Sequence, residues 1–427
     1  VMDELMRIDA GGSDSHERLH REAKLNIKLR PHQHQAIDFI NRRRGVLLGD
    51  MMRLRKAQPV DSMVLCPEGW RRIGDLVVGD RVIDPDGGAA AVEGVFPQGR
   101  RQVYRVTTCD GASARCCDDH LWLVHSPNDR LAQNSGRVLP LRELRDNLWQ
   151  QTPSRTWGRG NRKWFLPVCA PVELESIGDL PIDPYLLGIL LGDGGLSAGG
   201  VMLSNREPEI LDRVRASLPP GLHLLGGPQD WRISSGSASS RGCNSIRSAL
   251  ISLKLFGKKS TGKFIPAAYL RGSILDRTNL LRGLMDTDGC CLPDGQGMFS
   301  TSSPQLRDDV LELVRSLGGF ASLSYKPEPK YVYCGEARVG QPAFGLYTRM
   351  PFNPFFLSRK ANGWQRGYMA RGLESIEPDG EAECVCIKVS SKRSLYITDG
   401  HVVTHNTSTS LACHDFSRGR LVVIGPR

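Results

Sequence analysis

The feature that most constrains this chain is a strand-and-loop pattern that breaks off at Lys56 and resumes only at Thr407. Residues 45–52 form an apolar run that ends in a glycine turn, which predicts a strand followed by a loop. The helix expected next is missing after Lys56, and residues 407–427 supply a helical pattern and a further apolar strand. Because the two pieces complete one another, we expect residues 57–406 to be an insertion in a host protein.

Joined at Lys56 and Thr407, the flanks resemble the start of a Swi/Snf-like superfamily 2 helicase. The resemblance rests on the Leu-Arg-Pro-x-Gln element at residues 29–33 and on a Walker A phosphate loop that ends in Lys56 and Thr407. It implies that these two residues bind nucleotide and that the complete host uses ATP. Arg53 and Arg55 occupy positions where the family has glycine, so they should obstruct the backbone cradle for phosphate. We therefore interpret the flanks as an incomplete host.

Composition narrows the setting in which the chain works. Of its 427 residues, 40% are hydrophobic and 24% charged, as in ordinary globular proteins, and no apolar run is long enough for a membrane span. The first residues lack a signal-peptide pattern and the twelve cysteines are scattered, so we expect a cytoplasmic protein of a phage or bacterial host, with free thiols. A net charge of +10 favours a polyanionic partner.

The end of the insertion carries residues that can cut and rejoin a peptide chain. Asn406 can cyclise onto its own backbone carbonyl and so cleave the chain after itself. His405 can supply the proton transfers, and the hydroxyl of Thr407 can accept an acyl group. The tripeptide alone also fits an ordinary loop after a strand, so the prediction depends on matching residues upstream.

Matching residues are present, and the two ends of the insertion resemble an intein. Residues 111–122 are similar to the intein block in which a polar residue stands three positions before a histidine, here His120. Short β-rich segments separated by Gly and Asp fit a mostly β domain. The resemblance covers residues 57–180 and 371–406. It implies the horseshoe-shaped, all-β Hint fold and splicing that needs no cofactor.

Four positions resemble the class 3 inteins, which lack a nucleophile at their first residue. Ala57, the first residue of the insertion, has no nucleophilic side chain. Trp122, Cys386 and Thr404 occupy the positions of the Trp–Cys–Thr trio that marks this class. The resemblance implies that Cys386 attacks the carbonyl of Lys56 while the block histidine protonates the departing nitrogen. Two alternatives stay open: the trio members are ordinary core residues, or Ala57 replaces a natural cysteine.

The middle of the insertion contains one short pattern twice. An apolar run at residues 184–195 includes Asp193 near its end, and residues 281–289 repeat the pattern with Asp288. Both runs resemble the LAGLIDADG helix of homing endonucleases. Small residues on one face let two such helices approach closely, each with an acid at its C-terminal end. The resemblance implies that the two acids bind Mg²⁺ or Mn²⁺ at the scissile phosphate of double-stranded DNA.

Two lysines and one basic segment extend this prediction. Residues 257–266 resemble the family block that carries a catalytic lysine before Ile-Pro, here Lys263. Lys326 has a comparable place in the second half, where a solvated phosphate contact is the alternative. Residues 125–180 mix arginine with Trp, Pro and Gly, so we expect them either to face DNA or to form an irregular connection.

The sequence thus predicts a β-rich Hint splicing domain with an inserted α/β two-fold endonuclease, flanked by fragments of an α/β P-loop helicase. We expect a monomer that splices itself and cuts DNA, without membrane association. The competing hypotheses are a nucleic-acid-stimulated ATPase with an inactive intein and a Hint module that cleaves without ligation. The predicted segments are the host fragments 1–56 and 407–427, the splicing domain 57–180 and 371–406, and the endonuclease 181–370.

Overall fold

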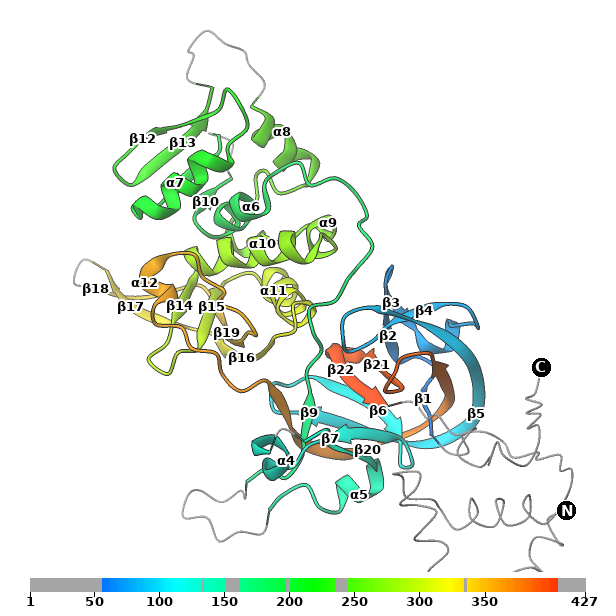
Figure 1. Cartoon of the computed structure of the whole chain (residues 1–427). Helices are drawn as coiled ribbons and strands as arrows, with labels where there is room; N and C mark the ends of the chain where they lie inside the picture. Colours follow the sequence, from blue (N-terminus) through cyan, green and yellow to red (C-terminus); the bar gives the residue numbers. More distant parts are fainter. Residues whose placement is uncertain are drawn as a thin grey trace, which may run out of the picture. The chain divides into compact units, whose positions relative to one another are not determined.

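The described part of the chain forms a β-rich lobe and an α/β lobe. The computed structural model describes residues 56–132, 134–150, 161–196, 200–235, 244–333 and 336–405. All of them belong to one compact unit, Arg55–Asn406. The β-rich lobe consists of residues 57–167 and 370–405, and the α/β lobe of residues 184–361 (Figure 1). The predicted host elements, together with Asn406 and Thr407, lie outside the described residues.

Short strands and turns dominate the β-rich lobe. Its elements are β1 (Gln58–Pro59), β2 (Met63–Cys66), β3 (Gly69–Arg72), η2 (Ile73–Asp75), β4 (Arg81–Ile83), β5 (Ala89–Thr108), β6 (Ser113–Cys117), β7 (Leu121–Val124), α4 (Pro127–Leu131), β8 (Arg137–Pro140), α5 (Leu141–Arg145), β9 (Phe165–Pro167), β20 (Ala370–Val389), β21 (Leu395–Thr398), η4 (Asp399–His401) and β22 (Val402–His405).

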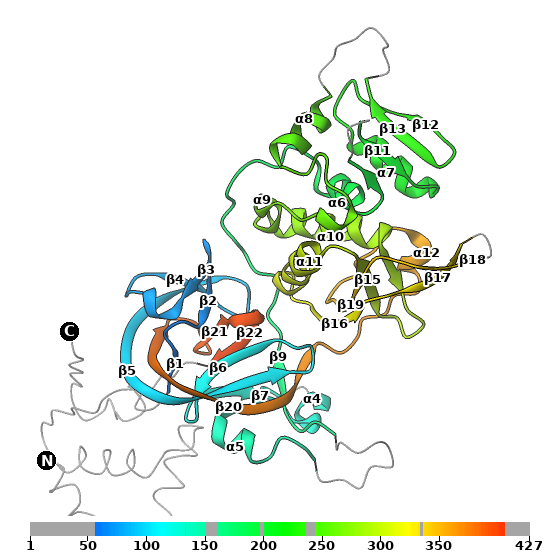
Figure 2. The same cartoon turned by 180° about the vertical axis from the view of Figure 1, so that it is seen from behind.

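Two long strands that are far apart in the sequence join the β-rich lobe together. Strands β5 and β20 pair antiparallel and curve side by side (Figures 1 and 2). Their register shifts at several points, and such irregularities bend a strand pair. One sheet has the order β1-β20-β5-β4, and the other has the order β3-β2-β21-β22-β7-β8. The predicted β-rich domain is therefore confirmed, and its strands come from both ends of residues 57–405.

The basic segment at residues 125–180 contributes to the β-rich lobe. Within it, β8 pairs with β7 and β9 pairs with β20. The guanidinium of Arg130 lies between the rings of Phe165 and Tyr368, 3.9 and 3.5 Å from their centroids. The described part of this segment is thus a packed extension of the sheets, and contact with DNA stays a prediction.

The α/β lobe is built from two halves. The first half contains α6 (Pro184–Gly192), β10 (Gly194–Gly195), β11 (Met202–Ser204), α7 (Pro208–Ser217), β12 (His223–Gly226), β13 (Asp230–Ser234), α8 (Ser245–Ser252), η3 (Ser260–Gly262) and α9 (Ala267–Leu270). The second half contains α10 (Ile274–Thr287), β14 (Gly289–Cys291), β15 (Gly297–Thr301), α11 (Pro304–Ser316), β16 (Phe320–Lys326), β17 (Lys330–Tyr333), β18 (Glu336–Val339), β19 (Ala343–Arg349) and α12 (Ser358–Ala361).

The two halves share one topology. Their sheets have the orders β10-β11-β13-β12 and β14-β15-β19-β16, and each half begins with one of the two paired central helices, α6 or α10. In both halves a helix follows the second strand, α7 in the first and α11 in the second. The repeated sequence pattern therefore corresponds to a repeated structural unit, as the two-fold prediction required.

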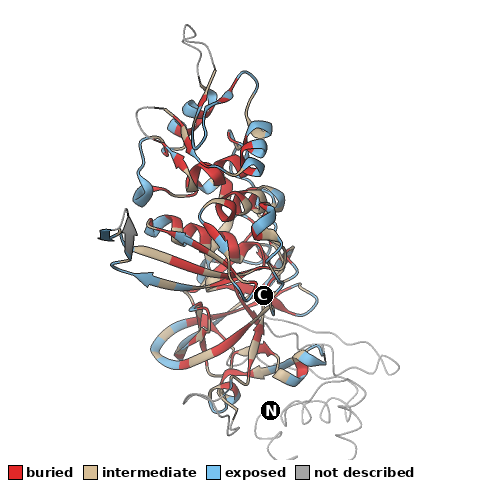
Figure 3. Cartoon of the chain, turned by 90° about the vertical axis from the view of Figure 1, so that its left-hand side faces the viewer, coloured by how far each residue is buried: buried red, intermediate tan, exposed pale blue. Residues whose placement is uncertain are grey.

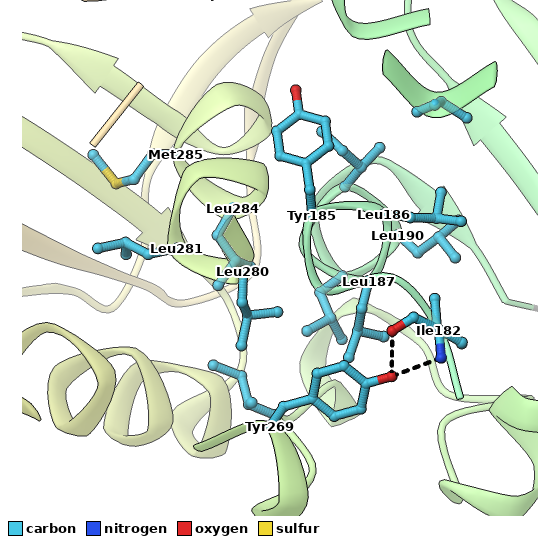
Figure 4. Close-up of a cluster of buried hydrophobic side chains, with 14 of the residues drawn as sticks. Ile182, Tyr185, Leu186, Leu187, Leu190, Tyr269, Leu280, Leu281, Leu284 and Met285 are labelled. Atoms are coloured by element: carbon cyan, nitrogen blue, oxygen red, sulfur yellow. Dashed lines mark hydrogen bonds between the residues drawn. The ribbon is translucent and has the colours of Figure 1, made fainter. Parts of the chain in front are cut away.

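Glycines set the distance between the two central helices. A Cβ atom added at Gly188 of α6 would lie 2.4 Å from the Leu280 carbonyl oxygen, and one at Gly283 of α10 would lie 2.3 Å from the Tyr185 oxygen. Side chains at these positions would push the helices apart, so the small residues permit close backbone packing. Leucines of both helices and Tyr269, which hydrogen-bonds Ile182, surround this contact (Figure 4).

Buried residues line the paired helices and the inner faces of the sheets (Figure 3).

Cap residues define where the two central helices begin. Asp183 accepts a hydrogen bond from the Leu186 amide at the start of α6, and Ser273 forms a capping box with Asp276 at the start of α10. Among the helices in the described ranges, none has the length and apolar character needed to cross a bilayer.

Candidate functional site

One group of predicted residues meets at the edge of the β-rich lobe near Ala57, the expected first residue of the insertion. Strand β1 pairs with β20 so that Gln58 faces Val385 and Pro59 faces Cys384. Continuing this antiparallel register by one residue sets Cys386 opposite Ala57. Both side chains are buried, with 7% and 1% of their surfaces exposed. Cys386, the predicted nucleophile, therefore lies on the strand next to the expected Lys56–Ala57 junction.

The same region contains a histidine bound to the predicted threonine. His120 Nε2 lies 2.6 Å from the Thr404 hydroxyl oxygen, and both residues are buried. The Trp122 ring packs edge-on against the imidazole, with 5.7 Å between ring centroids. Strand β22 delivers Thr404 and places His405 opposite Leu121 of β7. The structure thus brings together His120, Trp122, Thr404 and His405.

Burial keeps the two histidines of this group neutral. Desolvation, followed by the charge interaction with His405 and then by the positive charge of Lys56, lowers the pKa of His120 to about 3. Desolvation and Lys56 likewise lower the pKa of His405 to about 4. The Nδ1 atoms of both rings are buried without a hydrogen-bond partner. At neutral pH each ring therefore has one nitrogen that can take up a proton.

The structure adds Cys117, which sequence analysis did not name as a site residue. The Ala57 backbone nitrogen donates to Cys117 Sγ at 3.1 Å, and the Cys117 nitrogen donates to the Ala57 oxygen at 2.9 Å. Burial raises the pKa of this thiol above its ordinary value. Cys117 is the polar residue three positions before His120, so the block spacing was the signal that could have identified it.

The second group of predicted residues lies at the ends of the central helices of the α/β lobe. Asp193 caps the C-terminus of α6 and Asp288 caps that of α10. The backbone oxygens of the two acids accept equivalent bonds from Ser204 and Ser300, both at 3.1 Å. Asn205 also donates to the Asp193 carboxylate at 2.6 Å. The two predicted acids therefore occupy corresponding positions in the two halves.

The electrostatics of the two acids fit a divalent cation. Desolvation, and then repulsion from Asp193, raises the pKa of Asp288 to about 6. Desolvation also raises the pKa of Asp193. Two carboxylates that repel one another lose that penalty when a cation lies between them. Within the described ranges, no group of three or more His, Cys, Asp or Glu residues is arranged to hold a metal ion.

A buried lysine binds the backbone carbonyls at the end of each central helix. Lys263 Nζ donates to the oxygens of Leu190, Gly192 and Gly194 at 3.2, 3.0 and 2.8 Å. In the second half Lys360 Nζ donates in the same way to the oxygens of Met285, Asp286, Thr287 and Gly289, between 2.6 and 3.2 Å. These contacts satisfy carbonyls that a helix end leaves unpaired.

The second-half counterpart of Lys263 is therefore Lys360, which sequence analysis missed. Lys326, the residue expected there, lies exposed at the end of β16 and pairs in register with Ala343. Lys360 follows the Phe355-Phe356-Leu357 run and lacks the Ile-Pro that marks Lys263. A lysine in a short helix after an aromatic run was the available signal, and it is a weak one.

Comparison with known proteins gives three kinds of match. The family described as LAGLIDADG-like domain matches residues 276–340, in the second half of the α/β lobe. A relative, Replicative DNA helicase DnaB of Mycobacterium intracellulare, is 27% identical over 386 residues, which are 85% of this chain. The chain spans 60% of the length of that relative. The match does not single out the Swi/Snf-like class expected for the flanks.

Solved structures that resemble the chain include inteins and a homing endonuclease. A variant of the gp41-1 intein is 11% identical and covers 82% of this chain and 98% of its own, with a TM-score of 0.25. The MchDnaB-1 intein is 10% identical and covers 82% and 100%, with a TM-score of 0.24. I-DmoI in complex with DNA and Mn is 14% identical and covers 39% and 89%, with a TM-score of 0.25.

At these TM-scores the matches do not establish a common overall fold, and the sequence matches are more informative. The segment of the family match begins in α10 and includes Asp288, one of the two predicted acids. Residues 276–340 therefore match a LAGLIDADG-like domain, within a chain that is similar over 386 residues to a replicative DNA helicase.

Proposed function

We propose that residues 57–406 excise themselves and join residues 1–56 to residues 407–427. The observation that carries this proposal is the convergence of the Cys386 strand position, the buried Ala57 and the His120–Thr404 pair. Ala57 has no nucleophilic side chain and lies opposite Cys386 of β20, which favours the class 3 order of steps. The similarity to a DnaB helicase supports a helicase host, and interruption of its Walker A loop is part of the same proposal.

The first step transfers the N-terminal host fragment to Cys386. His120 Nε2 and the Thr404 hydroxyl oxygen are 2.6 Å apart, and we assign the tautomer in which Nε2–H donates, so that the unpartnered Nδ1 can accept the thiol proton. The sulfur then attacks the Lys56 carbonyl carbon, the C–N bond to Ala57 breaks, and His120 returns the proton to the departing nitrogen. Splitting one difficult substitution into two easier ones is the advantage of a covalent thioester.

The later steps use residues at the C-terminal junction. The Thr407 hydroxyl takes the acyl group from Cys386, which regains its proton. Asn406 then cyclises onto its own carbonyl with His405 as the proton-transfer group, which releases the insertion. The remaining ester rearranges to the Lys56–Thr407 amide. Burial lowers the pKa of His405 to about 4, so its ring is neutral near physiological pH and its unpartnered Nδ1 has a lone pair that can accept a proton.

For the α/β lobe we propose cleavage of double-stranded DNA at a specific site. Asp193 and Asp288 would hold Mg²⁺ or Mn²⁺, and a bound cation would neutralise phosphate charge and activate water. The repeat of the two halves supports a target read along both. Lys263 and Lys360 would act by fixing the backbone that carries the acids, because their ammonium groups are already bound to carbonyls.

Mass spectrometry of the expressed chain tests the splicing proposal. We expect two products, the free insertion 57–406 and a joined host fragment in which Lys56 is bonded to Thr407. Cleaved fragments without the joined product would instead indicate a module that only cleaves. An intact 427-residue chain would contradict both forms of self-processing.

A further inference from the structure

The turn that leads into β22 is held by a helix of the other lobe. Turn η4 ends at His401, three residues before Thr404 in the chain. We infer that Glu312 and Arg315, on α11 of the α/β lobe, are positioning residues for the splicing centre. The inference rests on the proposed splicing function, and it makes the α/β lobe a structural part of the splicing centre.

The turn has a conformation that needs support from its surroundings. His401 has a φ of 56°, which is unusual for a residue with a side chain, and only 1% of its surface is exposed. Neither ring nitrogen of His401 has a hydrogen-bond partner. Backbone strain of this kind persists only where the neighbouring structure fixes it.

Glu312 makes the first of two contacts with this turn. Its Oε1 accepts a hydrogen bond from Trp70 Nε1 at 2.9 Å, and its Oε2 lies 3.7 Å from His401 Nδ1. The Trp70 ring packs edge-on against the imidazole, with 5.0 Å between centroids. Glu312 therefore fixes the indole that covers His401, and the buried imidazole stays neutral because its pKa is lowered to about 4.

Arg315 makes the second contact through a buried carboxylate. Asp110 Oδ2 lies 3.5 Å from Arg315 Nη2 and 3.5 Å from Arg371 Nε. Arg371 in turn donates from Nη1 to the carbonyl oxygens of Gly400 and His401, both at 2.9 Å. Asp110 therefore orients Arg371, which holds the turn. The positive charge of Arg315, on the α/β lobe, in turn attracts the Asp110 carboxylate.

The path from this cluster to the chemistry is short. Strand β22 follows His401 directly, and its Thr404 hydroxyl meets His120 at 2.6 Å. A shift of the turn by a fraction of an ångström would lengthen that contact, and hydrogen bonds weaken steeply with geometry. Loss of either α11 contact should therefore slow the first splicing step.

Substitutions on one helix test this role in the full chain. We expect Glu312→Ala and Arg315→Met each to slow precursor consumption by about tenfold, the effect of losing one hydrogen bond to a charged group. Glu312→Gln keeps an oxygen that can accept from Trp70 and Arg315→Lys keeps a cation near Asp110, so both should restore most of the rate. Asp308→Ala, on the exposed face of α11, is the matched control and should splice normally.

The outcomes separate this inference from the proposed function. A wild-type chain that does not splice would contradict the proposed function itself. If the wild type splices and Glu312→Ala and Arg315→Met splice equally fast, the positioning role is wrong and the splicing proposal stands. If the conservative variants are as slow as the truncated ones, α11 acts only through general stability, and the positioning role is also wrong.

Discussion

At the scale of single residues, we propose different tasks for Cys117 and Cys386, which lie near the Lys56–Ala57 bond. Cys117 Sγ accepts from the Ala57 nitrogen, and burial raises its pKa, so it is a neutral hydrogen-bond partner. Cys386, opposite Ala57 in register, has the position of a nucleophile.

We expect Cys386→Ala to leave full-length precursor, because the substitution removes the thiol that is proposed to carry the acyl group. Cys117→Ser should keep splicing, because a hydroxyl oxygen can also accept from the Ala57 amide. Ala57→Ser should change little. Intact-mass analysis checks all three variants. Splicing in Cys386→Ala, or a requirement for a nucleophile at position 57, would show that the class 3 order is wrong.

The acid at the end of α10 predicts a pH-dependent cost in stability. The pKa of Asp288 is raised from 3.8 to about 6 in the folded chain, so the folded state binds more protons between these values. Stability should fall as pH rises through this window, and the penalty is complete above pH 6. Because Asp288 is exposed and solvent screens its charge, we expect this loss in the free energy of unfolding to be only about 1 kcal/mol.

Asp288→Asn should therefore raise Tm by about 2 °C at pH 8 and leave it unchanged at pH 3. Thermal melts at the two pH values measure this difference. The same variant should bind Mn²⁺ more weakly at pH 8, because one carboxylate is lost. An equal change of Tm at both pH values would mean that ionisation of Asp288 does not destabilise the folded chain.

At the scale of elements, the lysines at the helix ends are predicted to be structural supports for the acids. Lys263→Met would leave three carbonyl oxygens of the α6 end unpaired, at a cost of about 2 kcal/mol. We expect a Tm lower by about 5 °C, with a similar loss for Lys360→Met. Lys326→Met, at an exposed site, is the control and should keep the wild-type Tm. A stable Lys263→Met chain would contradict the support role.

The sequence was most informative where an element carries its own local pattern. The two central helices could be predicted because small and apolar residues and a terminal acid recur in each, and the structure places both acids at helix ends. The pairing of β5 with β20 could not be predicted in register, because a distant strand and several bulges determine it. Sequence analysis missed Lys360 for a related reason, since only its tertiary contacts with the end of α10 identify its role.

At the scale of the whole molecule, the two proposed activities use separate residues but share a boundary. Glu312 and Arg315 contact the β-rich lobe, whereas Asp193 and Asp288 lie at the C-terminal ends of α6 and α10. Contacts at the boundary can therefore affect splicing, and changes at the acids should not.

This separation gives the last prediction. Asp193→Asn and Asp288→Asn should abolish Mg²⁺-dependent cutting of DNA that carries the uninterrupted host site, because each removes one proposed metal ligand. Both variants should splice at the wild-type rate, since the His120–Thr404 pair is untouched. They should also still bind that DNA, with an affinity that falls as salt rises because phosphate contacts release counterions. Cutting and splicing assays on one preparation of each variant compare the two activities directly. Undiminished cutting by both variants would remove the acids from the mechanism, and a parallel loss of splicing would mean that the two lobes cannot act independently.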